Sequence, residues 1–203
     1  MSVVLSFLIH FSILLVSVVF HEVAHGFVAY KLGDETASRA GRLTLNPLRH
    51  LDPVGSILLP AAAFILGSPV MIGWAKPVPV NPSYFRHPLR DMMWVALAGP
   101  LTNFVLVLVA ILGWMFLPGL REIFLMVIQI NVVLACFNLI PIPPLDGSRV
   151  LAFFSPASVR QILFRLEPYG FVIVLILAYL GILNHILLWM LEPLYRLLGF
   201  LLG

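Results

Sequence analysis

Cysteine and charged residues are both scarce in this chain of 203 residues. Cys136 is the only cysteine, which excludes an intrachain disulfide and a cysteine-based zinc site. Only 10% of the residues are charged, and no stretch is polar enough for a soluble nucleotide-binding or peptide-binding module. The 12 lysines and arginines are scattered through short segments rather than gathered in a patch, so nucleic acid is not an expected partner.

Apolar residues dominate instead. They make up 61% of the chain, and the mean hydropathy of +1.05 is typical of a protein whose solvent is lipid. We therefore predict an all-α polytopic membrane protein, with a single membrane-embedded domain over 1–203. Segments near or above the ~20 residues that a helix needs to cross a bilayer are 3–30, 92–117, 123–140 and 169–190. The first has no basic n-region and no small-residue cleavage site, so we expect it to be retained.

A fifth apolar segment, 54–66, is too short to cross and contains Pro60, which favours a re-entrant or interfacial element. The basic residues agree with this interpretation. If 54–66 crossed the membrane, the 12 basic residues would be divided six against six between its two sides. If it does not cross, loops 31–90 and 142–168 hold ten of these basic residues on one side, and only Arg121 and Arg196 lie on the other. The sequence thus predicts four spans in the cytoplasmic membrane, with both termini outside and these two loops on the cytoplasmic side.

The first span ends in a motif typical of zinc hydrolases, His21-Glu22-x-x-His25. Residues four apart share one face of a helix, so His21 and His25 can offer two imidazoles to one Zn²⁺. Glu22 lies about 100° round the helix, where it can act as general base toward a water on the metal. Ionisable side chains at membrane depth are costly and by default mark a functional site.

The expected third ligand is Asp146, in the segment 138–147 at the end of the third span. Three prolines, at 141, 143 and 144, interrupt the helix there, and a broken helix at that depth is tolerated only where it is buried or lines a wet cavity. Asp146 reaches the same side of the membrane as His25 only if 54–66 does not cross. Charge asymmetry and metal geometry therefore favour the same topology.

Three motifs together resemble the site-2 protease family of intramembrane zinc metalloproteases: His21-Glu22-x-x-His25, Asn138-x-x-Pro141 to Leu145-Asp146-Gly147, and Ala98-Gly-Pro-Leu-Thr-Asn103. The resemblance implies a three-helix catalytic core in 1–30 and 91–147, one Zn²⁺ per chain, and cleavage of peptide bonds in or near transmembrane segments. It also implies a membrane-associated β-like loop within 31–90. The chain resembles small prokaryotic members, because it lacks an inserted PDZ domain and a nucleotide-sensing C-terminal domain. The remaining span lies in 168–203.

Further residues are assigned supporting roles. Asn138 is the candidate donor to the oxyanion of the reaction, with Asn103 as a second supporting amide, although both side chains could equally bond across helices. The period-two segments 41–46 and 76–81 are predicted strands. Val78 and Val80 could then pair with an extended substrate, or the prolines between them could simply keep an edge strand unpaired.

Two other functions remain open at this point. Intramembrane histidine and aspartate also build ion pathways, so a metal transporter is possible, although inverted repeats and a second histidine cluster are missing. A catalytically silent scaffold would not require Glu22. Under the protease interpretation the partners are a transmembrane protein substrate and the bilayer, and the oligomeric state is left open.

Overall fold

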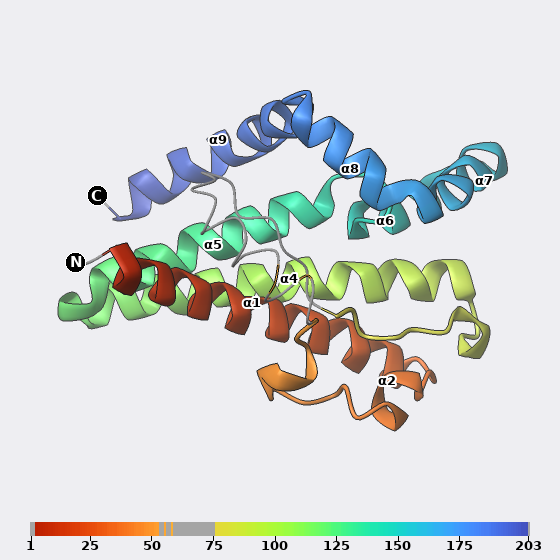
Figure 1. The fold of residues 1–203 in the computed structure, drawn as a ribbon, viewed down its shortest axis with the longest axis horizontal. Coiled ribbons are helices and arrows are strands. Elements are labelled where there is room, and N and C mark those ends of the chain that lie inside the picture. Colours follow the sequence, from red (N-terminus) through yellow and green to blue (C-terminus); the bar gives the residue numbers. More distant parts are fainter. Residues whose placement is uncertain (1–2, 53–54, 56–57, 59–75, 203) are drawn as a thin grey trace.

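The computed structural model describes residues 3–52, 55, 58 and 76–202, and all regular elements in this part of the chain are helices (Figure 1). Three long helices make up the centre: α1 (Val3–Lys31), α4 (Pro88–Phe116) and α5 (Arg121–Leu139). The shorter helices are α2 (Thr36–Arg39), α6 (Asp146–Phe154), α7 (Ala157–Leu166), α8 (Gly170–Tyr179) and α9 (Ile182–Leu202). Single 3₁₀ turns complete the set: η1 (Pro47–Arg49), η3 (Pro82–Tyr84), η4 (Pro118–Leu120) and η5 (Glu167–Tyr169).

The long helices form because their apolar sequences leave no other way to satisfy the backbone in lipid, where each N–H and C=O must bond within its own segment. α4 packs against both α1 and α5 and is thus the central helix of the three. Many large apolar side chains on these helices are exposed, among them Leu8, Leu108 and Phe116. Such surfaces are expected where the neighbour is lipid rather than water.

Four helical segments are long and apolar enough to cross a membrane, as predicted: Val4–Lys31, Pro88–Phe116, Pro118–Leu139 and Ala157–Tyr179. The bounds of the fourth differ from the predicted 169–190. Gly181, with φ of 73°, takes the left-handed conformation that ends a helix, and α9 begins at the next residue. The last part of the chain is therefore two helices, α8 and α9, with a break between them.

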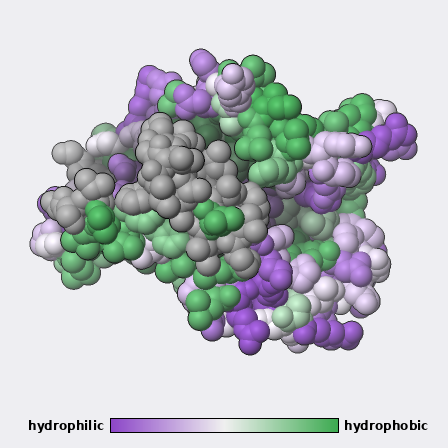
Figure 2. Space-filling view, in the orientation of Figure 1, coloured by the Kyte–Doolittle hydropathy of each residue, from purple (hydrophilic) through white to green (hydrophobic). Residues whose placement is uncertain are grey.

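Both termini lie at the left-hand end of the bundle in Figure 1, together with the connection between α4 and α5. α2, the start of α4, and α7 lie at the other end. Figure 2 shows hydrophilic residues at this second end and also at the upper left, over α9.

The predicted strands 41–46 and 76–81 are wrong, because neither segment is a strand in the described part of the chain. Backbone donors of the second segment bond to carboxylates instead of to a neighbouring strand. The N–H of Asn81 donates to Asp34 Oδ2 at 2.6 Å, and the N–H of Val78 donates to a side chain of α1. Pro77 and Pro79 have no N–H, so no ladder competes with these bonds. The segment 54–66, predicted to be re-entrant or interfacial, lies almost entirely outside the described residues.

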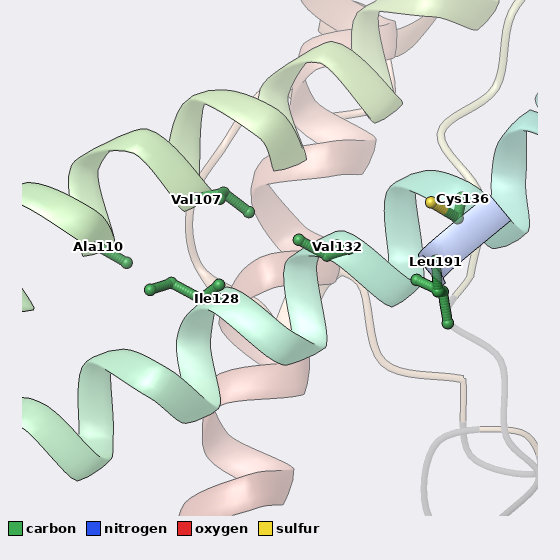
Figure 3. Close-up of a cluster of buried hydrophobic side chains, with 6 residues drawn as sticks. All are labelled: Val107, Ala110, Ile128, Val132, Cys136 and Leu191. Carbon is green, nitrogen blue, oxygen red and sulfur yellow. The ribbon is translucent and has the colours of Figure 1, made fainter. Parts of the chain in front are cut away.

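The buried core between the long helices is formed by small and branched side chains (Figure 3). Val107 and Ala110 of α4 face Ile128 and Val132 of α5. Cys136 and Leu191 extend the cluster toward α9, and the thiol is buried and free, as expected for a small apolar residue. This core fixes the positions of α4, α5 and α9 relative to one another.

Candidate metal centre

His21, His25 and Asp146 meet at one point between α1 and the start of α6. The two histidine Nε2 atoms are 2.9 Å apart, and Asp146 Oδ2 is 3.2 Å from that of His21 and 3.3 Å from that of His25. Both histidines are buried, with exposed fractions of 6% and 9%. The helical spacing of four residues accounts for the histidine pair, whereas the carboxylate comes from more than a hundred residues away in sequence.

Asp146 Oδ2 is buried and has no hydrogen-bond partner in the described structure. The carboxyl group of an aspartate is ordinarily an anion at neutral pH. A buried anionic oxygen beside two imidazole nitrogens is a donor set suited to a divalent metal ion.

The other nitrogen of each ring is engaged on the side away from Asp146. His25 Nδ1 lies 2.7 Å from the carbonyl oxygen of Val95, which can only accept, so this Nδ1 carries the hydrogen. His21 Nδ1 lies 2.6 Å from Asn103 Oδ1. α4 thus supplies the groups that orient both rings, and hydrogen bonds of this kind are the usual support of metal-binding histidines.

Glycine allows two helices to come this close. A Cβ atom on Gly99 of α4 would lie 2.5 Å from ring atoms of both His21 and His25. A Cβ atom on Gly147 would lie 2.1 Å from the carbonyl oxygen of Leu139, where α6 starts beside the end of α5. Both glycines belong to motifs of the sequence, Ala98-Gly-Pro and Leu-Asp-Gly147. Because they have no side chain, α4 and Asp146 can approach α1 this closely.

Glu22 completes the arrangement, and it is bonded to the segment 76–81. Its Oε2 accepts the N–H of Val78 at 2.7 Å. Donor atoms of Glu22 and the two histidines all lie within 4.8 Å of one another. Pairing with substrate was one of two alternatives for the backbone of Val78, and here its N–H is already bonded to Glu22.

A cavity of about 300 Å³ opens at this site. Its walls include the two histidines, Glu22 and Asp146. Val78 and Val80 of the segment 76–81 also line it, as do Asn138 and Arg149, which lie on either side of the proline break. Asn138 Nδ2 donates to the Leu134 carbonyl at 2.9 Å, which engages one of its two amide hydrogens. Of the supporting amides, Asn138 thus lies in the cavity wall, whereas Asn103 lies behind His21.

Asp91, at the start of α4, is engaged away from this site. Its carboxylate accepts the N–H of His87 at 3.0 Å at the start of α4 and pairs with Arg90 at 3.1 Å. His10 bonds to a carbonyl four residues earlier in its own helix, and His185 bonds to the Gly181 carbonyl just before α9. His50 Nε2 lies 2.8 Å from the Thr44 carbonyl and donates to it. None of these four groups lies in the wall of the cavity.

Sequence reasoning missed Ser17 and Asn131, which lie behind Asn103 and bond to it or to each other. Two signals were visible. Ser17 precedes His21 by one helical turn of four residues, and Asn131 precedes Asn138 by seven residues, so each pair shares a helix face. The sequence did not indicate which faces of α1, α4 and α5 pack against one another.

Comparison with known proteins agrees with these observations. The sequence model of Peptidase family M50 matches residues 115–181, which include the end of α5 and Asp146. No solved structure matches the chain.

Three relatives carry the name putative zinc metalloprotease. YwhC of Bacillus subtilis is 43% identical over 188 residues, covering 87% of this chain and 82% of the relative. Rip2 of Mycolicibacterium smegmatis is 32% identical, covering 89% and 69%, and MJ0611 of Methanocaldococcus jannaschii is 35% identical, covering 66% and 63%. The extent and identity of the match to YwhC show that the chain belongs to peptidase family M50, the site-2 protease family.

Proposed function

We propose that the chain is an intramembrane zinc endopeptidase that hydrolyses peptide bonds in or near transmembrane segments of other proteins. His21, His25 and Asp146 would hold one Zn²⁺, and Glu22 would act as general base. Family membership supports the class of enzyme. The arrangement of donor atoms supports the assignment of residues.

The observation that carries the proposal is the convergence of three electron-pair donors. With Nδ1 of His25 bonded to the Val95 carbonyl, its Nε2 presents a lone pair to Asp146 Oδ2, which has no donor of its own. Such atoms repel one another unless a cation lies between them. Ligands of one tetrahedral zinc, at about 2.0–2.2 Å from the metal, are about 3.3–3.6 Å apart. The distances of 3.2 and 3.3 Å from Asp146 Oδ2 to the two histidine Nε2 atoms are close to this range, and the Nε2 atoms themselves are nearer, at 2.9 Å.

The chain's own groups supply the proton transfer. Zinc, when bound, would polarise the scissile carbonyl and activate water. Glu22 would take the proton from the attacking water and give it to the leaving amine, so no covalent bond to the protein forms. The N–H of Val78 holds one carboxylate oxygen of Glu22, which limits the orientations that the base can take.

Asn138 would support the developing oxyanion. One of its amide hydrogens is bonded to Leu134, and the second is left for a carbonyl oxygen in the cavity. Val80 lines the same cavity and remains a candidate contact for an extended substrate. Because Val78 already donates to Glu22, pairing of substrate with its N–H would require that bond to break.

Membrane placement follows from charge. Ranges 31–90 and 142–168, which hold ten basic residues, connect elements at the end of the bundle opposite the termini. By the positive-inside rule this end faces the cytoplasm. The zinc site would then lie near the cytoplasmic side of the cytoplasmic membrane, with both termini outside.

The test is cleavage of a panel of transmembrane peptides by the purified full chain in detergent, with cuts mapped by mass spectrometry. We expect cleavage that a chelator abolishes and added zinc restores, and no cleavage by Glu22→Gln. Zinc uptake into liposomes that contain the protein, without any cleavage, would instead favour a metal transporter. Zinc-independent cleavage would contradict the proposed site.

A further inference from the structure

A chain of hydrogen bonds runs from His21 into the centre of the bundle. His21 Nδ1 bonds to Asn103 Oδ1 at 2.6 Å, and Asn103 Nδ2 donates to Asn131 Oδ1 at 2.8 Å. Asn131 Nδ2 donates to Ser17 Oγ and to the carbonyl oxygen of Val127, both at 2.9 Å. Three helices, α1, α4 and α5, thus contribute to one continuous polar path.

This path is closed to water. The exposed fraction is 0% for both Asn103 and Asn131 and 3% for Ser17. Polar groups between membrane spans are costly unless they are bonded, and here each one has a protein partner. The reaction proposed above makes no use of Asn131, whose side chain touches neither the cavity nor an ionisable group.

The last acceptor determines the direction of every bond in the path. The Val127 carbonyl can only accept, so the atom of Asn131 that faces it must be Nδ2, and Oδ1 must face Asn103. Asn103 must then present Nδ2 to Asn131 and Oδ1 to His21. An amide oxygen only accepts, so the hydrogen of the neutral His21 ring lies on Nδ1, and Nε2 keeps a free lone pair.

We propose that Asn131 is a positioning residue that selects the zinc-binding tautomer of His21 through Asn103. This inference rests on the proposed function, in which His21 Nε2 binds zinc. His25 needs no such relay, because the Val95 carbonyl orients its ring directly. The two histidines of one motif are therefore oriented in different ways. A backbone carbonyl orients His25 directly, whereas His21 is oriented by two side-chain amides, the second of which donates to a backbone carbonyl.

Loss of Asn131 removes the constraint on Asn103. The side-chain amide of Asn103 is then able to rotate by about 180° and present Nδ2 to His21. The ring hydrogen of His21 would then lie on Nε2, where it blocks metal binding. Removal of Ser17 has a smaller effect, because Asn131 still donates to Val127 and its direction is unchanged. Partners of metal-binding histidines typically change metal affinity by about 10- to 100-fold when they are replaced.

The experiment measures zinc affinity of the full chain in detergent by chelator competition, and the d–d absorption of the cobalt-substituted protein. For Asn131→Leu we expect zinc affinity to fall about 10- to 100-fold. For Ser17→Ala we expect it to stay within about threefold of wild type, since the amide direction is retained. The matched control is Gln129→Leu, which removes an exposed amide from the same helix and should leave zinc affinity unchanged.

A double-mutant cycle separates this role from simple helix packing. If Asn131 acts only through Asn103, the double variant Asn103→Leu with Asn131→Leu should bind zinc no more weakly than Asn103→Leu alone. If Asn131→Leu does not fold, Asn131→Ser keeps a polar group that is too short to reach both partners, and the same fall is expected.

Two results would overturn the inference: wild-type zinc affinity in a folded Asn131 variant, or losses that multiply in the double variant. Absence of zinc binding by the wild-type chain would instead overturn the proposed function itself.

Discussion

At the scale of single residues, Glu22 and the metal ligands have separable roles. Glu22→Gln keeps the size of the side chain but cannot accept a proton. We expect the variant to bind zinc with wild-type affinity while its cleavage rate falls about 10²- to 10⁴-fold. Zinc content by atomic absorption and peptide cleavage by mass spectrometry measure the two properties on one sample. Cleavage at the wild-type rate would remove Glu22 from the proposed role.

Asp146→Asn is expected to act on the metal first. It replaces the anionic oxygen that lies 3.2 and 3.3 Å from the two histidine Nε2 atoms with a neutral one. Zinc affinity should therefore fall by more than the roughly 10- to 100-fold that follows loss of a supporting residue. Chelator competition measures this fall, with Asp91→Asn as the matched control, because Asp91 caps α4 away from the cavity. If both variants kept full zinc occupancy, a different third ligand would be required.

At the scale of secondary-structure elements, the close approach of α4 to α1 depends on Gly99. Gly99→Ala would place a methyl group 2.5 Å from both histidine rings. Overpacking of this kind costs about 1–3 kcal/mol, which corresponds to roughly 5- to 150-fold in zinc affinity if the rings move. Gly199→Ala is the control, since a Cβ atom there meets nothing within 4 Å. Equal zinc affinity in the two variants would show that the helices separate without disturbing the site.

The segment 76–81 contributes a backbone donor rather than a strand. Val78→Pro removes the N–H that bonds to Glu22, and loss of a hydrogen bond to a charged group costs about 1.5–3 kcal/mol, so cleavage should fall roughly tenfold or more with zinc retained. Val78→Ala keeps the N–H and should stay within about threefold of wild type. Similar cleavage rates for the two variants would show that this bond is not needed in the reaction.

At the scale of the whole molecule, the site requires that 54–66 does not cross the membrane. A crossing there would separate His25 and Asp146 by about 30 Å of hydrocarbon. A single cysteine at Gly67 or Ser68, in a Cys136→Ala background, should therefore react with an impermeant thiol reagent from the cytoplasmic side only. Labelling from outside would show that these ligands do not share a metal.

Sequence reasoning succeeded where the pattern is local and failed where a partner decides the outcome. The His21 and His25 pair follows from helical periodicity, and four spans and the family follow from composition and motifs. The predicted strand at 76–81 was wrong because its donors found carboxylates of α1 and its turn, and the fourth span was misplaced because Gly181 breaks it. Neither result can be read from alternation or hydropathy.

The sequence by itself determined that this is a helical membrane protein. It also determined that one helix carries two histidines and a glutamate with the spacing of a zinc-hydrolase motif. These properties depend on composition and on spacings within one turn of a helix. The tertiary structure alone decided that Asp146 faces that helix, that Gly99 admits the rings, and that Asn103 and Asn131 orient one of them. Such contacts join residues up to 125 positions apart, and only the packing of α1, α4, α5 and α6 brings their atoms within bonding distance.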